Sequence, residues 1–259
     1  MYNDLFSIGP FTVHGYGLMI AIGIAAAYLF AARMAKKRNL SEDEVFNILM
    51  VALVGGFASS KCLFYLTILP EILKDPGIIL RTFSSGWVVF GGIIGGILAV
   101  MLYCKIRKID FLSYADFCMP AVALAQGFGR IGCLLAGCCY GVATSSRFAI
   151  TFTHSDFAPN NIALFPAEPV MSVLDFFHFG ILTLIMSKSK KKGTVTICYL
   201  IFYSIGRFVI EFYRGDLERG SVGVLSTSQF ISIFVCIAGL ITLFVRAKKT
   251  KQVEDSLQD

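Results

Sequence analysis

Seven long apolar segments, joined by shorter polar ones, most limit what this chain can fold into. Each has the length that a helix needs, about 20 residues, to cross ~30 Å of membrane hydrocarbon. With 15% charged and 56% hydrophobic residues, the chain is far more apolar than soluble domains, in which about 25% of residues are charged. The sequence therefore predicts an all-α integral membrane protein with seven transmembrane helices. The expected spans cover residues 14–34, 45–68, 86–104, 115–136, 169–187, 194–213 and 226–246.

The spans are expected to form one transmembrane domain, residues 1–246, followed by a polar cytoplasmic tail, residues 247–259. The first residues, MYNDLFSIGP, lack the basic stretch and cleavage site of a signal peptide, so the first span is expected to stay in the membrane. The one long connection, residues 137–168, lies between spans four and five. Its stretch RFAITFTH (residues 147–154) alternates apolar and polar residues, which predicts a short amphipathic strand.

Lysine and arginine are distributed unevenly between the two sets of connections. Basic runs follow spans one, three, five and seven, at residues 33–38, 105–108, 188–192 and 246–251. The other connections hold Lys74, Arg81, Arg147, Arg214 and Arg219. Because cytoplasmic loops carry the excess of basic residues, the N-terminus is expected outside and the C-terminus in the cytoplasm, with the long connection on the outer side. The net charge of +6 has the same explanation, and no nucleic-acid partner is expected.

Three basic residues, Lys61, Arg130 and Arg207, fall inside the expected spans. Charge within the hydrocarbon layer is costly, so such residues are candidates for function. A long basic side chain can instead extend to the membrane surface, and this alternative carries most weight for Lys61.

Polar residues of several spans reach the outer half of the membrane in this topology. Span four brings Gln126 and Arg130 there, and span six brings Arg207, Glu211 and Arg214. The outer ends of spans one and three add His14, Tyr16, Ser85, Trp87 and Phe90. One polar site close to the outer face is therefore expected.

Helical spacing places some of these polar residues on the same face of a helix. Arg207, Glu211 and Arg214 follow an i, i+4, i+7 pattern that puts them on one helix face, and Gln126 and Arg130 share a face in the same way. Glu211 is expected to pair with Arg207, which leaves excess positive charge toward a cavity. Guanidinium groups at the depth of lipid head groups suit a phosphate. The alternative is an ion-pair network that only holds the spans together.

Glycines and histidines offer weaker signals. Glycine pairs at 55–56, 91–92 and 95–96 suit close helix packing. The stretch GFGRIG (residues 127–132) lacks the spacing and the preceding strand of a dinucleotide-binding loop. His154 is expected to be a solvated loop residue, and the sequence assigns no role to His178.

Five of the eight cysteines stand singly within apolar segments, where a cysteine acts as a small apolar residue. Cys133, Cys138 and Cys139 lie together. Their C-x4-C-C spacing differs from the C-x2-C pairs of zinc sites, and adjacent cysteines rarely form a disulfide without strain. They are interpreted as small packing residues, with a reactive thiol relay as the alternative, and no metal ion is expected.

Four segments of the chain are similar to those of one family. They are LFSIGPFTVHGYGLM (5–19), SGWVVFGGIIGG (85–96), GRIGCLLAGCCYG (129–141) and YSIGRFVIEFYRGDLERG (203–220). In this order they resemble the bacterial phosphatidylglycerol–prolipoprotein diacylglyceryl transferases. The third segment occupies the place of the family signature, G-R-x-G-N-F-x-N-x-E-x-x-G. The resemblance covers nearly the whole chain and agrees with seven spans.

The resemblance implies a multi-pass enzyme of the bacterial cytoplasmic membrane that needs no cofactor. Its expected partners are phosphatidylglycerol, the lipobox segment of a preprolipoprotein and membrane lipids. The diacylglyceryl group would move from phosphatidylglycerol to the lipobox cysteine thiol, which forms a thioether and releases glycerol phosphate. Arg130 and Arg207 would stabilise the leaving phosphate, and Arg214, Gln126 and Gly141 are expected to complete the phosphatidylglycerol site.

Several positions depart from the family pattern. Phe90 stands where many members have a histidine, Cys133 and Cys138 replace the signature Asn and Glu, and Phe165-Pro166 replaces a His-Pro pair. The catalytic base cannot therefore be copied from the family, although the acceptor thiol must still lose its proton.

His14, Tyr16 and Glu211 are the remaining candidates for the base. The arginines could also lower the pKa of the acceptor thiol enough to dispense with one. Two other functions are left open: a relative that transfers a phospholipid-derived group to another acceptor, and a lipid-binding or transport protein without chemistry. The second is disfavoured because transporters often contain inverted repeats, and the sequence shows no convincing repeat.

Overall fold

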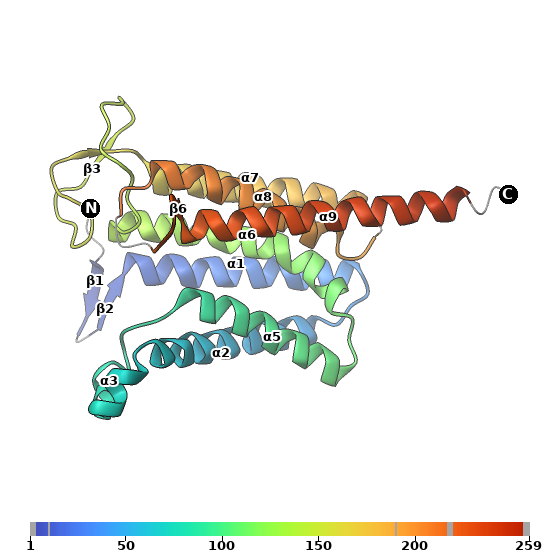
Figure 1. The fold of residues 1–259 in the computed structure, drawn as a ribbon, viewed down its shortest axis with the longest axis horizontal. Coiled ribbons are helices and arrows are strands. Elements are labelled where there is room, and N and C mark those ends of the chain that lie inside the picture. The colour runs from blue at the N-terminus through green and yellow to red at the C-terminus, as the bar shows by residue number, and fades with distance from the viewer. Residues whose placement is uncertain (1–3, 10, 190, 217–219, 256–259) are drawn as a thin grey trace. The chain divides into compact units, whose positions relative to one another are not determined.

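A computed structural model describes residues 4–9, 11–189, 191–216 and 220–255 (Figure 1). Within these residues, seven helices are long and apolar enough to cross a membrane. They are α1 (Gly15–Lys37), α2 (Glu42–Thr67), α5 (Val89–Arg107), α6 (Phe111–Ala136), α7 (Ala167–Lys188), α8 (Thr194–Ile210) and α9 (Thr227–Asp255). The predicted all-α membrane fold with seven spans is confirmed.

The long helices present large apolar side chains on their outer faces. Val54, Ile94, Phe177, Leu184 and Phe244 are all more than half exposed. Large exposed apolar side chains in such numbers are unfavourable in water. The hydrocarbon of a membrane suits such side chains, which agrees with the small buried share of these helices.

The chain forms two compact units, residues 31–114 and residues 1–30 together with 115–259. The smaller unit contains α2 and α5, with the short helices α3 (Leu69–Lys74) and α4 (Ile78–Arg81) in the connection between them. The larger unit contains residues 15–30 of α1, most of α6, and the whole of α7, α8 and α9.

Glycines allow α2 and α5 to pack closely within the smaller unit. A Cβ atom added to Gly95 would lie 1.9 Å from Ser59 Oγ, and one on Gly55 would lie 2.5 Å from the Cβ of Ala99. Neither position has room for a side chain. The prediction that these glycines serve helix packing is confirmed.

Lys61 has a structural role in the smaller unit. It is 9% exposed, and its Nζ donates hydrogen bonds to the carbonyl oxygens of Thr82 (2.5 Å), Ser85 (2.6 Å) and Gly86 (3.3 Å). The ammonium group also lies 4.8 Å from the centre of the Trp87 ring, within cation–π range. Lys61 therefore fastens the segment before α5 and does not extend to the surface.

Among the described residues of the larger unit, three pairs of short strands are antiparallel, one before α1 and two in connections between helices. They pair β1 (Asp4–Ile8) with β2 (Phe11–His14), β3 (Ile150–Thr151) with β4 (Ala163–Leu164), and β5 (Ser221–Val222) with β6 (Leu225–Ser226). The strand predicted at 147–154 is thus correct only for residues 150–151. The long connection folds over its own small core of Phe152, Ala158 and Leu164, so tertiary packing and not strand pairing decides its shape.

Helix α9 continues to Asp255, so most of the segment expected as a polar tail is helical. Lys and Gln, which occur between 247 and 255, are good helix formers, and a preceding long helix removes the cost of nucleation.

Candidate functional site

A buried carboxylate sets the relative depth of the two helices that carry the intramembrane arginines. Asp116 of α6 is 3% exposed and accepts hydrogen bonds from the amides of Gly193 (2.6 Å) and Thr196 (3.0 Å) and from Thr196 Oγ1 (2.9 Å), at the N-terminus of α8. A carboxylate is favourable at this helix end. Arg130 follows Asp116 along α6, and Arg207 follows Gly193 along α8, by the same number of residues. This spacing is a rise of about 21 Å along each helix, so the two arginines lie at the same depth.

Arg130 lies on α6 where that helix approaches α7. Ser172 Oγ donates a hydrogen bond of 2.9 Å to the carbonyl oxygen of Gly127, and a Cβ on Gly127 would lie 2.7 Å from the Phe176 ring. Arg130 Nε is 3.9 Å from Asp175 Oδ2 across this contact. This ion pair is longer than a hydrogen bond, so the terminal amino groups of Arg130 keep their capacity to donate to a ligand.

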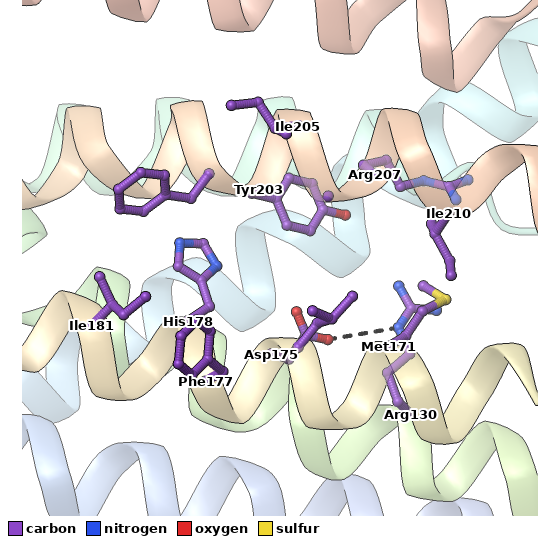
Figure 2. A pocket seen from close by; sticks show the side chains of 13 residues that line it. Arg130, Met171, Asp175, Phe177, His178, Ile181, Tyr203, Ile205, Arg207 and Ile210 are labelled. Carbon is purple, nitrogen blue, oxygen red and sulfur yellow. Dashed lines mark ion pairs between the residues drawn. The ribbon is translucent and has the colours of Figure 1, made fainter.

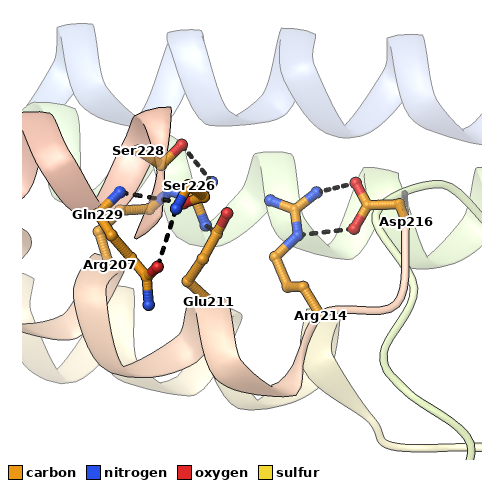
Figure 3. A network of polar contacts seen from close by, with 7 residues as sticks. All are labelled: Arg207, Glu211, Arg214, Asp216, Ser226, Ser228 and Gln229. Carbon is orange, nitrogen blue, oxygen red and sulfur yellow. Dashed lines mark hydrogen bonds and ion pairs between the residues drawn. The ribbon is translucent and has the colours of Figure 1, made fainter. Parts of the chain in front are cut away.

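Arg207 is held more tightly than Arg130. Its Nη1 lies 2.7 Å from Glu211 Oε2, and its Nη2 donates to Ser228 Oγ at 2.9 Å (Figure 3). The Arg207 side chain is 13% exposed and the Glu211 side chain 4%. The predicted pairing of Glu211 with Arg207 is confirmed.

The N-terminus of α9 supplies the second partner of Arg207 through a capping box. Ser226 Oγ accepts from the amide of Gln229, and Gln229 Oε1 accepts from the amide of Ser226, both at 3.1 Å (Figure 3). This reciprocal arrangement satisfies two amides at the helix end. It also fixes the first turn of α9, and with it Ser228.

Arg214 does not share a helix face with Arg207 and Glu211, contrary to the expectation from spacing. Helix α8 ends at Ile210, a 3₁₀ turn η1 (Glu211–Tyr213) follows, and Arg214 is extended. The Arg214 side chain is 7% exposed, and its guanidinium donates two hydrogen bonds to Asp216, at 3.0 and 2.5 Å (Figure 3). Burial lowers the pKa of Arg214, but the bonds to Asp216 and nearby negative charge outweigh it and place the pKa above its usual value.

Gly141 joins the long connection to the Arg214 segment. The two residues form an antiparallel bridge, flanked by hydrogen bonds from the Val142 amide to the Tyr213 carbonyl (3.0 Å) and from the Gly215 amide to the Tyr140 carbonyl (2.9 Å). A Cβ on Gly141 would lie 2.3 Å from the carbonyl oxygen of Phe165. Gly141 is therefore required for spacing between backbones.

Arg130 and Arg207 line one pocket between α7 and α8 (Figure 2). Both guanidinium groups lie toward the same end, near Met171 and Ile210. Away from them the pocket is lined mainly by apolar and aromatic side chains, which are Leu174, Phe177, Ile181, Phe202, Tyr203 and Ile205, and by His178. Phe177 and Ile205 are more than half exposed, so the apolar part faces the lipid side of the helices.

The charges at this site are balanced more closely than the sequence predicted. Asp175, Glu211 and Asp216 each form an ion pair with one arginine. The prediction of excess positive charge at this site is therefore wrong while these three ion pairs are formed. Arg130 has the loosest pair, which makes its guanidinium the one that an anionic ligand can recruit at the lowest cost.

Gln126, Tyr16 and His14, which the sequence also predicted, do not line this pocket. Gln126 accepts a hydrogen bond of 3.0 Å from the Tyr199 hydroxyl. Tyr16 packs on Gly132, where a Cβ would lie 3.2 Å from its ring. His14 Nδ1 is 2.6 Å from Asp4 Oδ1, and both side chains are more than half exposed.

Comparison with known proteins identifies the family. The sequence model described as prolipoprotein diacylglyceryl transferase matches residues 3–245. The chain belongs to the prolipoprotein diacylglyceryl transferase family. A phosphatidylglycerol–prolipoprotein diacylglyceryl transferase of Clostridium tetani is 45% identical over 236 residues, 91% of this chain and 94% of the relative. Clostridium perfringens has two relatives so named: number 2 is 42% identical over 93% of both chains, and number 1 is 32% identical over 95% of this chain and 96% of its own length.

Two acidic residues of helix α7 in this transferase family member were not predicted from the sequence. Asp175 pairs with Arg130, and Glu168, at the start of α7, is 1% exposed. The rule that singles out intramembrane arginines applies equally to carboxylates, so the acidic residues within 167–188 carried the same signal. What the sequence could not supply was their partner, because α6 and α7 meet only in the folded protein.

Proposed function

We propose that this protein transfers the diacylglyceryl group of phosphatidylglycerol to the lipobox cysteine thiol of preprolipoproteins, the first step of lipoprotein maturation. One observation carries the proposal: in a seven-helix member of this family, guanidinium groups from two helices lie at one end of a pocket whose other lining residues are mainly apolar, with Asp175 and His178 the charged or titratable exceptions. A polar, cationic end continuous with an apolar channel is the shape of a binding site for an anionic phospholipid.

Phosphatidylglycerol fits this pocket in one orientation. Its phosphate would lie between Arg130 and Arg207, and an acyl chain would follow Phe177, Ile181 and Phe202 toward the lipid side. The pocket opens along an exposed apolar face, so the acyl chains need not leave a hydrocarbon environment. Arg130 would turn from Asp175 toward the phosphate, since their contact of 3.9 Å is weak.

The chemistry requires stabilisation of a leaving phosphate. The acceptor sulfur forms a bond to the terminal glyceryl carbon, and the bond from that carbon to the phosphate oxygen breaks. Glycerol phosphate leaves with the electron pair, and its growing charge is stabilised by Arg130 and Arg207. Glu211 and Ser228 would hold Arg207 in place, so the conformational entropy of its side chain is already lost before the substrate binds.

The other residues predicted for the site are given proposed roles. Gln126 and Arg214 would support the pocket from outside, and Gly141 would set the backbone spacing behind Arg214. Tyr16 and His14 stay candidates for proton transfer near the acceptor thiol. Glu211 is a poorer candidate for a base than the sequence suggested, because its carboxylate already pairs with Arg207 at 2.7 Å.

The site is proposed to face the outer side of the bacterial cytoplasmic membrane. Within the larger unit, basic residues between α7 and α8 lie at the opposite end of α8 from Arg207. If that basic end is cytoplasmic, both arginines lie at the level of the outer head groups, where an exported preprolipoprotein would present its lipobox.

A transfer assay tests this proposal. Purified protein in detergent is incubated with phosphatidylglycerol and a lipobox peptide, and the diacylglyceryl mass gain of the peptide is measured. Arg130→Ala and Arg207→Ala should each reduce transfer by about 10²-fold or more, the usual effect of removing a charge-stabilising donor. Arg147→Ala, at an exposed residue of the long connection, is the matched control and should transfer normally.

The same assay separates the two other functions. Consumption of phosphatidylglycerol without peptide modification indicates a different acceptor. Head-group binding without turnover indicates a lipid-binding or transport protein. Wild-type rates in both pocket variants, with unchanged gel-filtration profiles, would exclude the site.

A further inference from the structure

The end of α6 brings two cysteines together in a way that their spacing conceals. Gly137 takes a left-handed φ of +72°, the Cys138 amide donates to the Cys133 carbonyl at 3.1 Å, and the Gly137 amide donates to the Leu134 carbonyl at 3.2 Å. These two bonds define a Schellman motif, in which the residue after the left-handed glycine returns over the last turn of the helix. Two cysteines with this C-x4-C spacing therefore lie close together at the end of the helix.

A third thiol joins this pair. The sulfur atoms of Cys133, Cys138 and Cys139 all lie within 4.8 Å of one another. Cys139 has a φ of +62°, a conformation that non-glycine residues seldom adopt. A packing contact at the helix end needs only Cys133 and Cys138, so the packing interpretation from the sequence leaves the third thiol unexplained.

Three clustered thiols match the ligand set of a thiophilic metal ion. With Zn–S bonds of about 2.3 Å, tetrahedral geometry places sulfur atoms about 3.8 Å apart, so the cluster needs to contract by at most about 1 Å. Sulfur-only ligands favour Zn²⁺ or Cu⁺ over hard cations. Three thiolates around Zn²⁺ leave one net negative charge, and Arg214, which pairs with Gly141 two residues after Cys139, brings a positive charge to the same segment.

We propose that Cys133, Cys138 and Cys139 bind a zinc-class metal ion whose fourth position takes the thiol of the acceptor cysteine. Three protein ligands and one open position are the arrangement of catalytic zinc sites. The second half of the proposal rests on the proposed transferase function. A metal-bound acceptor thiol would be activated without a protein side chain acting as base.

Transfer to the metal-bound acceptor sulfur needs no reactant besides the acceptor thiol and phosphatidylglycerol. On coordination the acceptor S–H group releases its proton to the medium, since a metal-bound thiol is deprotonated. The sulfur lone pair then forms the S–C bond, the C–O bond to phosphate breaks, and glycerol phosphate carries away the electron pair. The metal ion keeps its oxidation state, and the thioether, a weaker ligand, leaves.

Metal titration tests the site without reference to catalysis. Reduced protein in detergent is titrated anaerobically with Zn²⁺ and with Co²⁺, and bound metal is measured by elemental analysis and by cobalt–thiolate absorption. One ion per chain is expected, with at least tenfold weaker binding for Cys133→Ser, Cys138→Ser and Cys139→Ser. Cys198→Ser, at a half-buried cysteine of α8, should bind metal as the wild type does.

A peptide titration tests the open position. A lipobox peptide should change the cobalt spectrum, whereas the same peptide with serine in place of cysteine should not. The proposal is overturned if binding is not stoichiometric, if Cys139→Ser binds equally well, or if the cysteine peptide leaves the spectrum unchanged. Absence of thioether in the transfer assay, with these titrations positive, would count against the transferase function alone.

Discussion

Gly141→Ala is expected to damage the protein through a steric clash between two backbones. The new Cβ would lie 2.3 Å from the Phe165 carbonyl oxygen and 2.8 Å from the Phe165 Cβ. The Phe165 amide is itself bonded to the Val142 carbonyl at 2.8 Å, so this backbone cannot move away without losing a hydrogen bond. Overpacking costs about 1–3 kcal/mol, and the upper value applies because the neighbour is backbone.

A loss of about 3 kcal/mol corresponds to a decrease in Tm of about 6–12 °C for a chain of this size. Because Gly141 bridges Arg214, transfer should fall with stability, by at least about tenfold even below the Tm. Both quantities are measured in the same detergent, by thermal unfolding and by the peptide mass assay.

Gly129→Ala is the matched control, since it adds the same methyl group within the same signature. A Cβ on Gly129 meets nothing within 4 Å, and alanine is favoured over glycine within a helix by up to about 1 kcal/mol. Its Tm should therefore be unchanged or higher. The steric reasoning is refuted if Gly141→Ala melts and transfers like wild type. If Gly141→Ala keeps its Tm but no longer binds phosphatidylglycerol, Gly141 contacts the head group, as the sequence suggested.

Two further predictions concern buried charges. Glu211→Gln removes one partner of a buried ion pair and should lower the free energy of unfolding by about 3 kcal/mol, with transfer reduced at least tenfold because Arg207 loses its anchor; equal stability in chemical denaturation would contradict this. Lys61→Met removes three hydrogen bonds to carbonyl groups and should lower the free energy of unfolding by about 3 kcal/mol. Hydrogen exchange should be faster at residues 82–88, an effect that Lys105→Met, at an exposed lysine, should not share.

Much of the architecture followed from hydropathy and charge. A membrane span must be long, apolar and helical, so seven such segments predict seven helices whatever their neighbours are. The cost of burying charge singled out Arg130 and Arg207, and both line one pocket. The pairing of Arg207 with Glu211 was predictable because i, i+4 contacts belong to a single helix.

Periodicity failed where the chain leaves the helix. Arg214 was placed on the face of Arg207 by extrapolating an α-helix that ends at Ile210. The strand predicted at 147–154 was reduced to two residues, because a local alternation of apolar residues does not reveal which neighbours will cover them.

The sequence by itself determined the class of this protein, its seven helices, and the two arginines that membrane burial makes costly. Tertiary structure alone decided that Asp175 faces Arg130 and that Gly141 lies between two backbones. The physical reason is range: hydropathy and helical spacing act within one segment. Contacts between helices depend on groups that come together only when the chain has folded.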